Sequence, residues 1–80
     1  MRRMYTVLIP LGEWVRHIGD IEDIYSLTEL LGQDFIGGGT EAIEGSTFKV
    51  LRPITKEALD ILSDYLDSRN VKYEVKDVPS

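Results

Sequence analysis

The first apolar run of the chain covers residues 4–9 and is almost continuous. A run of this kind, rich in β-branched and aromatic residues, is typical of a strand buried on both faces. Pro10 ends the strand, because proline cannot donate a hydrogen bond to a sheet ladder. We therefore expect a central strand, followed by a connection over residues 11–19 in which Trp14 caps one end of the core.

Two later segments have apolar residues at the three-to-four-residue spacing of an amphipathic helix. The first begins at Asp20, a favoured N-cap residue, and ends at Gly32, which suits the left-handed position after a helix. The second begins after Thr55, another N-cap residue, and runs to about Arg69, with Asn70 as its stop. Its apolar stripe consists of Ala58, Leu59, Ile61, Leu62, Tyr65 and Leu66.

Alternating polar and apolar residues indicate further strands on either side of the second helix. Residues 44–45, Glu-Gly, predict a tight hairpin turn, because glycine supplies the positive φ that such turns require. In the segment 46–53 that follows, Val50 points to one face and Leu51 to the other. Residues 71–76 alternate in the same way and predict the last strand.

The resulting order, βαββαβ, is that of a ferredoxin-like α+β domain. Right-handed crossovers in both halves place the two helices on one face of a four-stranded antiparallel sheet. Numbered along the chain, the strands are expected in the spatial order 4-1-3-2. A chain of 80 residues forms one domain, so residues 1–80 are expected to share a single core.

A glycine-rich stretch, Phe35-Ile36-Gly37-Gly38-Gly39-Thr40, lies in the second strand, at an edge of this predicted sheet. A phosphate-binding loop would need a helix directly after the glycines, whereas here a strand follows. Two interpretations remain open. The stretch is either a bulge that twists the edge away from aggregation, or a contact site where another chain pairs with the accessible backbone. For the second interpretation the candidate residues are Gly37, Gly38, Gly39 and Thr40.

The segment Tyr5-Thr6-Val7-Leu8-Ile9-Pro10-Leu11, together with residues 35–40 and the hairpin at Gly45, carries a family resemblance. The chain resembles a loose group of small uncharacterised bacterial and phage proteins, in which a strand ending in Ile-Pro-Leu precedes a helix and an FGG-x-T-like strand. Ile36 departs from that pattern. The resemblance implies a ferredoxin-like fold and a phage or mobile-element origin, and it carries over no catalytic residue.

Four carboxylates recur on the second predicted helix at spacings of three, four and three residues. At about 100° per residue these spacings bring them together on the side opposite Leu62. The stripe is either a solvated helix face or a docking strip for a basic partner. It consists of Glu57, Asp60, Asp64 and Asp67.

Fourteen acidic residues against nine basic ones give a net charge of −5, which disfavours nucleic acid as a partner. The chain has no cysteine and one histidine, His17, so we expect no metal site and no cofactor. The apolar run behind the basic N-terminus stops at Pro10, which argues against a signal peptide, and no run is long enough for a membrane span. We therefore expect a cytoplasmic protein.

Enzymatic chemistry finds little support, because the serines lack nucleophile-elbow glycines, although a carboxylate pair among Asp34, Glu41 and Glu44 stays open. We expect a non-enzymatic protein-binding protein, such as a small inhibitor, immunity or accessory protein. The alternative is a homodimeric module that binds a small molecule. We also expect a homodimer, formed through the glycine-bearing edge or through a sheet face on which Leu8 and Leu51 both project.

Overall fold

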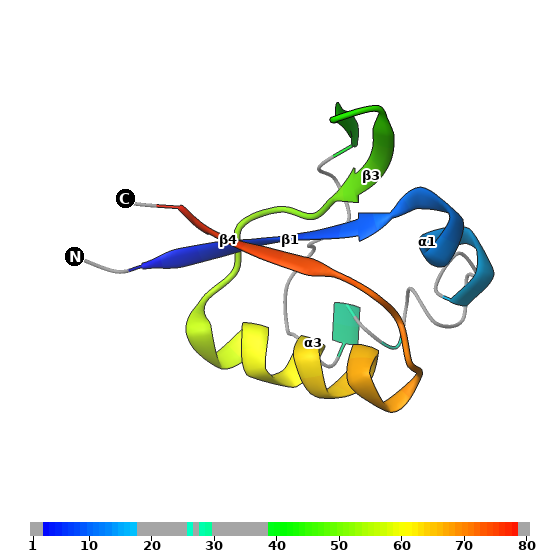
Figure 1. Cartoon of the computed structure of the whole chain (residues 1–80). Coiled ribbons are helices and arrows are strands. Elements are labelled where there is room, and N and C mark those ends of the chain that lie inside the picture. The colour runs from blue at the N-terminus through cyan, green and yellow to red at the C-terminus, as the bar shows by residue number, and fades with distance from the viewer. Residues whose placement is uncertain (1–2, 18–25, 27, 30–38, 79–80) are drawn as a thin grey trace.

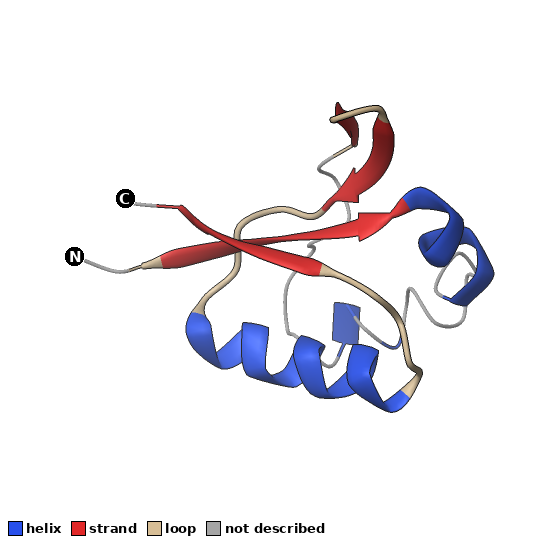
Figure 2. Cartoon of the chain, in the orientation of Figure 1, coloured by secondary structure: helices blue, strands red, loops and turns tan. Residues whose placement is uncertain are grey.

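The structure is a computed structural model, which describes residues 3–17, 26, 28–29 and 39–78 (Figure 1). These residues form a four-stranded antiparallel sheet with helices beside it (Figure 2). The elements are β1 (Met4–Pro10), α1 (Leu11–His17), β2 (Thr40–Ile43), β3 (Ser46–Val50), α3 (Lys56–Ser68) and β4 (Glu74–Val78). The strands lie in the order β2-β3-β1-β4, which confirms the α+β arrangement predicted for a ferredoxin-like domain.

The central strand β1 is buried on both faces, as its continuous apolar run predicted. Val7 and Ile9 are 0% exposed and belong to the core that α3 covers. Leu8 projects to the opposite face, since successive side chains of a strand alternate, and it lies in register with Val50 of β3. Leu8 is nevertheless only 2% exposed, so both faces of β1 are closed to solvent at this point.

The helix α3 supplies the largest share of the core. Its residues Ala58, Leu59, Leu62 and Leu66 face the sheet, and the last two are fully buried. Burial of a leucine side chain contributes about 1.5–3 kcal/mol relative to an exposed one, so this apolar stripe fixes the helix against the sheet. The other side of α3 is thereby turned to solvent.

Both ends of α3 are capped as the sequence predicted. The Oγ1 of Thr55 accepts a hydrogen bond from the backbone N–H of Ala58 at 3.3 Å, which satisfies one of the first-turn donors. At the other end Asn70 has a φ of 57°, the left-handed conformation that stops a helix. The backbone N–H of Val71 then donates to the carbonyl of Leu66 at 3.0 Å and brings Val71 into the core.

The prediction that Leu51 projects from the same face as Leu8 is wrong. Leu8 lies beside Val50, so Leu51, the next residue, points to the opposite face, where it is 1% exposed within the core. The prediction assumed a register between β1 and β3 that differs by one residue from the observed one. A shift of one residue exchanges the two faces of a strand. Neither leucine offers exposed area to a second copy, so the predicted homodimer has no support from this pair.

Two elements differ from the expected ones, and a third lies mostly outside the described residues. The connection after β1 is the helix α1, in which Trp14 is buried as the predicted cap of the core. The last strand begins at Glu74 rather than at Val71, because Val71 is still bonded to the end of α3. The helix expected from Asp20 to Gly32 falls mostly outside the described residues, and its described residues, Ser26, Thr28 and Glu29, are helical.

Candidate functional site

The hairpin between β2 and β3 has the turn that the sequence predicted. Glu44 and Gly45 have φ values of 50° and 83°, and two-residue hairpin turns of type I′ require positive φ at both positions. The turn fixes the register of the two strands, with Ile43 opposite Ser46 and Glu41 opposite Phe48. The position of every residue of β2 follows from this turn.

Gly39, the last of the three glycines, is joined to the sheet. Its φ is 76°, and its carbonyl oxygen accepts a hydrogen bond from the backbone N–H of Val50 at 2.9 Å. A Cβ on Gly39 would meet nothing within 4 Å, so the backbone conformation alone calls for glycine here. Gly37 and Gly38 lie outside the described residues, so the bulge and contact-site interpretations bear only on Gly39 and Thr40.

The strand β2 is an exposed edge. Thr40, Glu41 and Ala42 are all exposed, and β3 is their sheet neighbour on one side. Because Gly39 directs its carbonyl toward β3 and backbone groups alternate along an antiparallel strand, Thr40 and Ala42 direct theirs away from the sheet. The backbone N–H and C=O groups of these two residues therefore take no part in the ladder with β3.

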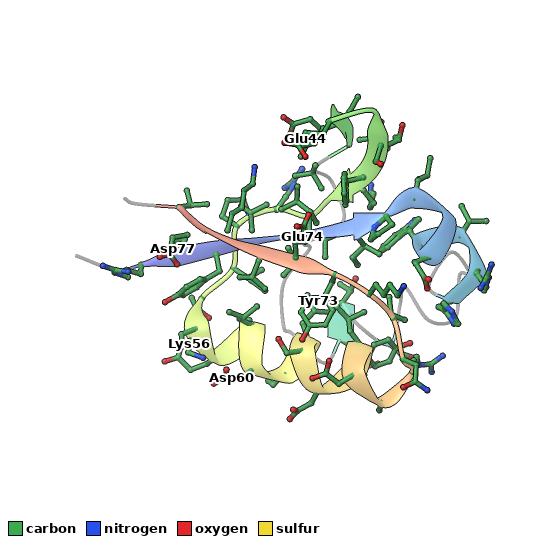
Figure 3. The ribbon with its side chains drawn as sticks, viewed as in Figure 1. Glu44, Lys56, Asp60, Tyr73, Glu74 and Asp77 are labelled. Carbon is green, nitrogen blue, oxygen red and sulfur yellow. The ribbon has the colours of Figure 1, made fainter. Side chains whose placement is uncertain are left out.

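The four carboxylates predicted to form a stripe are all exposed on the solvent side of α3. Two of them have partners within the chain. Lys56 Nζ lies 2.7 Å from Asp60 Oδ1, and the hydroxyl of Tyr73 donates to Asp67 Oδ1 at 3.1 Å (Figure 3). The remaining members of the stripe, Glu57 and Asp64, take part in none of the ion pairs or hydrogen bonds found among the described side chains.

The ion pair on α3 changes the acidity of its cation. The hydrogen bond to Asp60, and then the negative charge of that carboxylate, raise the pKa of Lys56 above its ordinary value of 10.5. Lys56 therefore stays protonated throughout the neutral range. It neutralises one member of the stripe and leaves the stripe acidic.

The structure does not bring the two predicted sites together. In Figure 1 the β2–β3 hairpin projects on one side of β1, while α3 lies on the other. The residues at Gly39 and Thr40 and the four carboxylates of α3 are therefore separate surfaces.

The remaining polar groups form small local contacts. His17 Nε2 lies 3.3 Å from Glu13 Oε2 within α1, and Arg3 pairs with Asp77 at 3.2 Å across β1 and β4. Within residues 3–17, 26, 28–29 and 39–78, no three histidine or carboxylate side chains are grouped so that they could hold a metal ion. Nor is any helix in that part of the chain long and apolar enough to cross a membrane.

An open hollow of about 340 Å³ lies where the start of β1 meets the first turn of α3. It is lined by Arg3, Tyr5, Thr55, Lys56 and Glu57. Charges of both signs line it, and the Arg3 side chain is 74% exposed. The hollow therefore has neither the enclosure nor the apolar lining that a small-molecule site requires.

Sequence reasoning missed two features. The first is a contact between a cation and an aromatic ring: Lys49 lies opposite Ile9, with its Nζ 5.5 Å from the ring centroid of Trp14. The second is the outward backbone of Ala42, since the candidate contact site predicted from the sequence ended at Thr40. The predicted turn at residues 44–45 could have indicated this direction, since a two-residue turn determines which backbone groups of the strand point toward its neighbour.

No family model, no curated protein and no solved structure matches the chain. The resemblance to small bacterial and phage proteins stays a prediction.

Proposed function

We propose that the protein is a non-enzymatic protein-binding protein, of the inhibitor, immunity or accessory type, which acts by occupying the surface of a basic partner. The observation that carries this proposal is the exposed acidic face of α3. All four of its carboxylates, Glu57, Asp60, Asp64 and Asp67, lie on the side of the helix that the core leaves open.

The backbone positions that carry the four carboxylates are fixed relative to one another, because α3 is capped by Thr55 and anchored by Leu62 and Leu66. A rigid arrangement of charge costs less conformational entropy on binding than a flexible one. The α3 face therefore presents a constant pattern to a partner, with Asp64 at its middle and unpaired among the described residues.

The charge of the whole chain acts in the same direction. The net charge is −5, and on α3 only Lys56 pairs with a member of the acidic face. Clustered charge of one sign raises the rate at which a partner of opposite charge is captured, and the effect weakens as salt is added. A partner with a basic surface would therefore be complementary in charge to this helix.

The proposal is tested by capture from an extract of the source organism. The chain is immobilised at its C-terminus, beside the Asp64→Lys variant and a matched Glu74→Lys variant, which makes the same charge change on β4. We expect the parent and Glu74→Lys to retain one basic protein that elutes with salt, and Asp64→Lys to retain less of it. Capture that is equal on all three chains, or absent on all, would contradict the proposal.

The alternative, a homodimeric module for a small molecule, predicts a different result. Its ligand would raise the melting temperature of the chain in a metabolite screen, and Asp64→Lys would leave that shift unchanged. A shift of this kind without protein capture would replace the proposal.

A further inference from the structure

The two edges of the sheet differ in how they are protected. Along β1, Val7 accepts from the N–H of Leu51, and Tyr5 exchanges hydrogen bonds with Ile54, so the odd-numbered residues point toward β3. The even-numbered residues of β1 therefore point toward β4, and their partners there leave Val75 and Asp77 with outward backbone groups.

The β4 edge is guarded by charges of both signs. Lys76 lies within the strand, and Asp77 is held by Arg3 at 3.2 Å. Lysines and ion pairs along an edge discourage further strand pairing. A partner strand would meet a mixed and already paired surface here.

Among the described residues, the β2 edge has no such guard. Its outward residues are Thr40 and Ala42, whose side chains are short and exposed. The charged residues of β2 and of its turn are both acidic. Glu41 lies within the strand and Glu44 lies in the turn (Figure 3), whereas Lys49, the cation of the hairpin, lies on the inner neighbour β3. No ion pair among the described residues involves either glutamate.

A second copy of the chain fits this edge poorly. Thr40 and Ala42 of both copies can all form hydrogen bonds in one antiparallel register, in which Thr40 of each copy lies opposite Ala42 of the other. That register places Glu41 directly opposite Glu41 of the second copy. Like charges at such a position destabilise strand pairing, and the non-hydrogen-bonded position is the one with the closest side chains.

We infer that the β2 edge binds an extended basic segment of a partner protein by β-addition, with a lysine or arginine of that segment opposite Glu41. Backbone hydrogen bonds to Thr40 and Ala42 supply the pairing, and the cation opposite Glu41 selects the register. The inference rests on the proposed protein-binding function and adds a second contact, on the other side of the molecule from α3.

The test uses a short synthetic peptide in which valine and lysine alternate, titrated into the isotope-labelled chain and followed by amide NMR shifts. A peptide with glutamate in place of lysine tests the charge, and one with alternate N-methylated backbone tests strand pairing. We expect the lysine peptide to shift the amides of Thr40 and Ala42, the other two to bind far more weakly, and added salt to weaken the lysine peptide.

Two variants and a matched control locate the site. Ala42→Pro removes an outward N–H and spares the ladder with β3, because that N–H points away from the sheet. Val75→Pro does the same on the β4 edge. We expect Ala42→Pro to lower the affinity for the lysine peptide by about tenfold and Val75→Pro to leave it unchanged. Glu41→Lys, which alters no backbone group, should reverse the preference in favour of the glutamate peptide.

Several outcomes would overturn the inference. These are unchanged binding in both β2 variants, equal losses in Ala42→Pro and Val75→Pro, or self-association of the parent that Ala42→Pro abolishes, which would make a second copy the occupant. Because the peptide requires no natural partner, its result is independent of capture. A captured partner that Ala42→Pro still retains would overturn the inference and leave the proposed function intact.

Discussion

The backbone N–H of Val50 donates to the carbonyl oxygen of Gly39 at 2.9 Å, and this bond joins the glycine-rich stretch to the sheet. It also determines the direction of every backbone group that follows in β2. Gly39 directs its carbonyl inward, so Thr40 directs its own groups outward. The exposed edge of the molecule thus begins at the last glycine.

Substitution of Gly39 tests whether its positive φ matters. The φ of 76° is costly for any residue with a Cβ, although nothing lies within 4 Å of the position that a Cβ would take. We expect Gly39→Ala to destabilise the chain by about 1 kcal/mol, through the backbone alone. Gly12→Ala is the matched control. It adds the same methyl group in equally open space within a helix, and it should be neutral or stabilising by a few tenths of a kcal/mol. Urea denaturation measures the stability of both variants. Equal effects of the two substitutions would contradict the requirement for glycine at the positive φ of residue 39.

The core prediction compares two neighbouring residues of α3. Leu62 is 0% exposed, whereas Ile61 is 38% exposed. Leu62→Ala should cost about 2–5 kcal/mol, because it removes apolar contacts and leaves a cavity, while Ile61→Ala should cost about 1 kcal/mol or less. The expected stability of a chain of this length is about 4–12 kcal/mol, so Leu62→Ala removes a large part of it. Denaturation midpoints that fall equally in the two variants would contradict the orientation of the helix.

The ion pair between Lys56 and Asp60 predicts a pH dependence at the alkaline end. The pKa of Lys56 is raised above 10.5 in the folded chain by its hydrogen bond to Asp60, so the folded state holds this proton more tightly than the unfolded one. The stabilisation is fully present below pH 10.5 and is lost as the pH rises through the raised pKa. The side chains are 61% and 63% exposed, so solvent screens the pair and the effect is small.

Melting temperatures of the parent and of Lys56→Gln measure this dependence between neutral and strongly alkaline pH. The difference between them should be positive at neutral pH and should shrink as Lys56 loses its proton. Lys72→Gln removes an exposed lysine that has no ion pair among the described residues, so it serves as the control. A difference in melting temperature between the parent and Lys56→Gln that stays constant across this pH range would contradict a stabilising ion pair between Lys56 and Asp60.

Local rules predicted local structure well in this chain. The turn at Glu44 and Gly45, the cap at Thr55 and the stop at Asn70 were each predicted from the conformational preferences of a few adjacent residues. The spatial order of the strands was also predicted correctly from the βαββαβ order of the elements along the chain, because right-handed, uncrossed connections allow few topologies for that order.

The faces of β3 could not be predicted in the same way. Val50 and Leu51 are both apolar, so alternation shows that they point apart but not which of them meets α3. The pairing of Leu8 with Val50 decides the question, and that pairing depends on residues far apart in the chain. The same limit applied to the candidate site. The acidic face of α3 follows from helical spacing, whereas the outward backbone of β2 depends on the register of the hairpin.

The central claim is that the acidic face of α3 guides a basic partner, and the association rate constant at low ionic strength tests it most directly. The parent, Asp64→Lys and the matched Glu74→Lys are compared against the captured partner, with a melting curve for each chain as a folding control. We predict that Asp64→Lys slows association by roughly threefold to tenfold more than Glu74→Lys does, and that about 1 M salt removes the difference. Equal association rates for the two variants at low salt would contradict the claim.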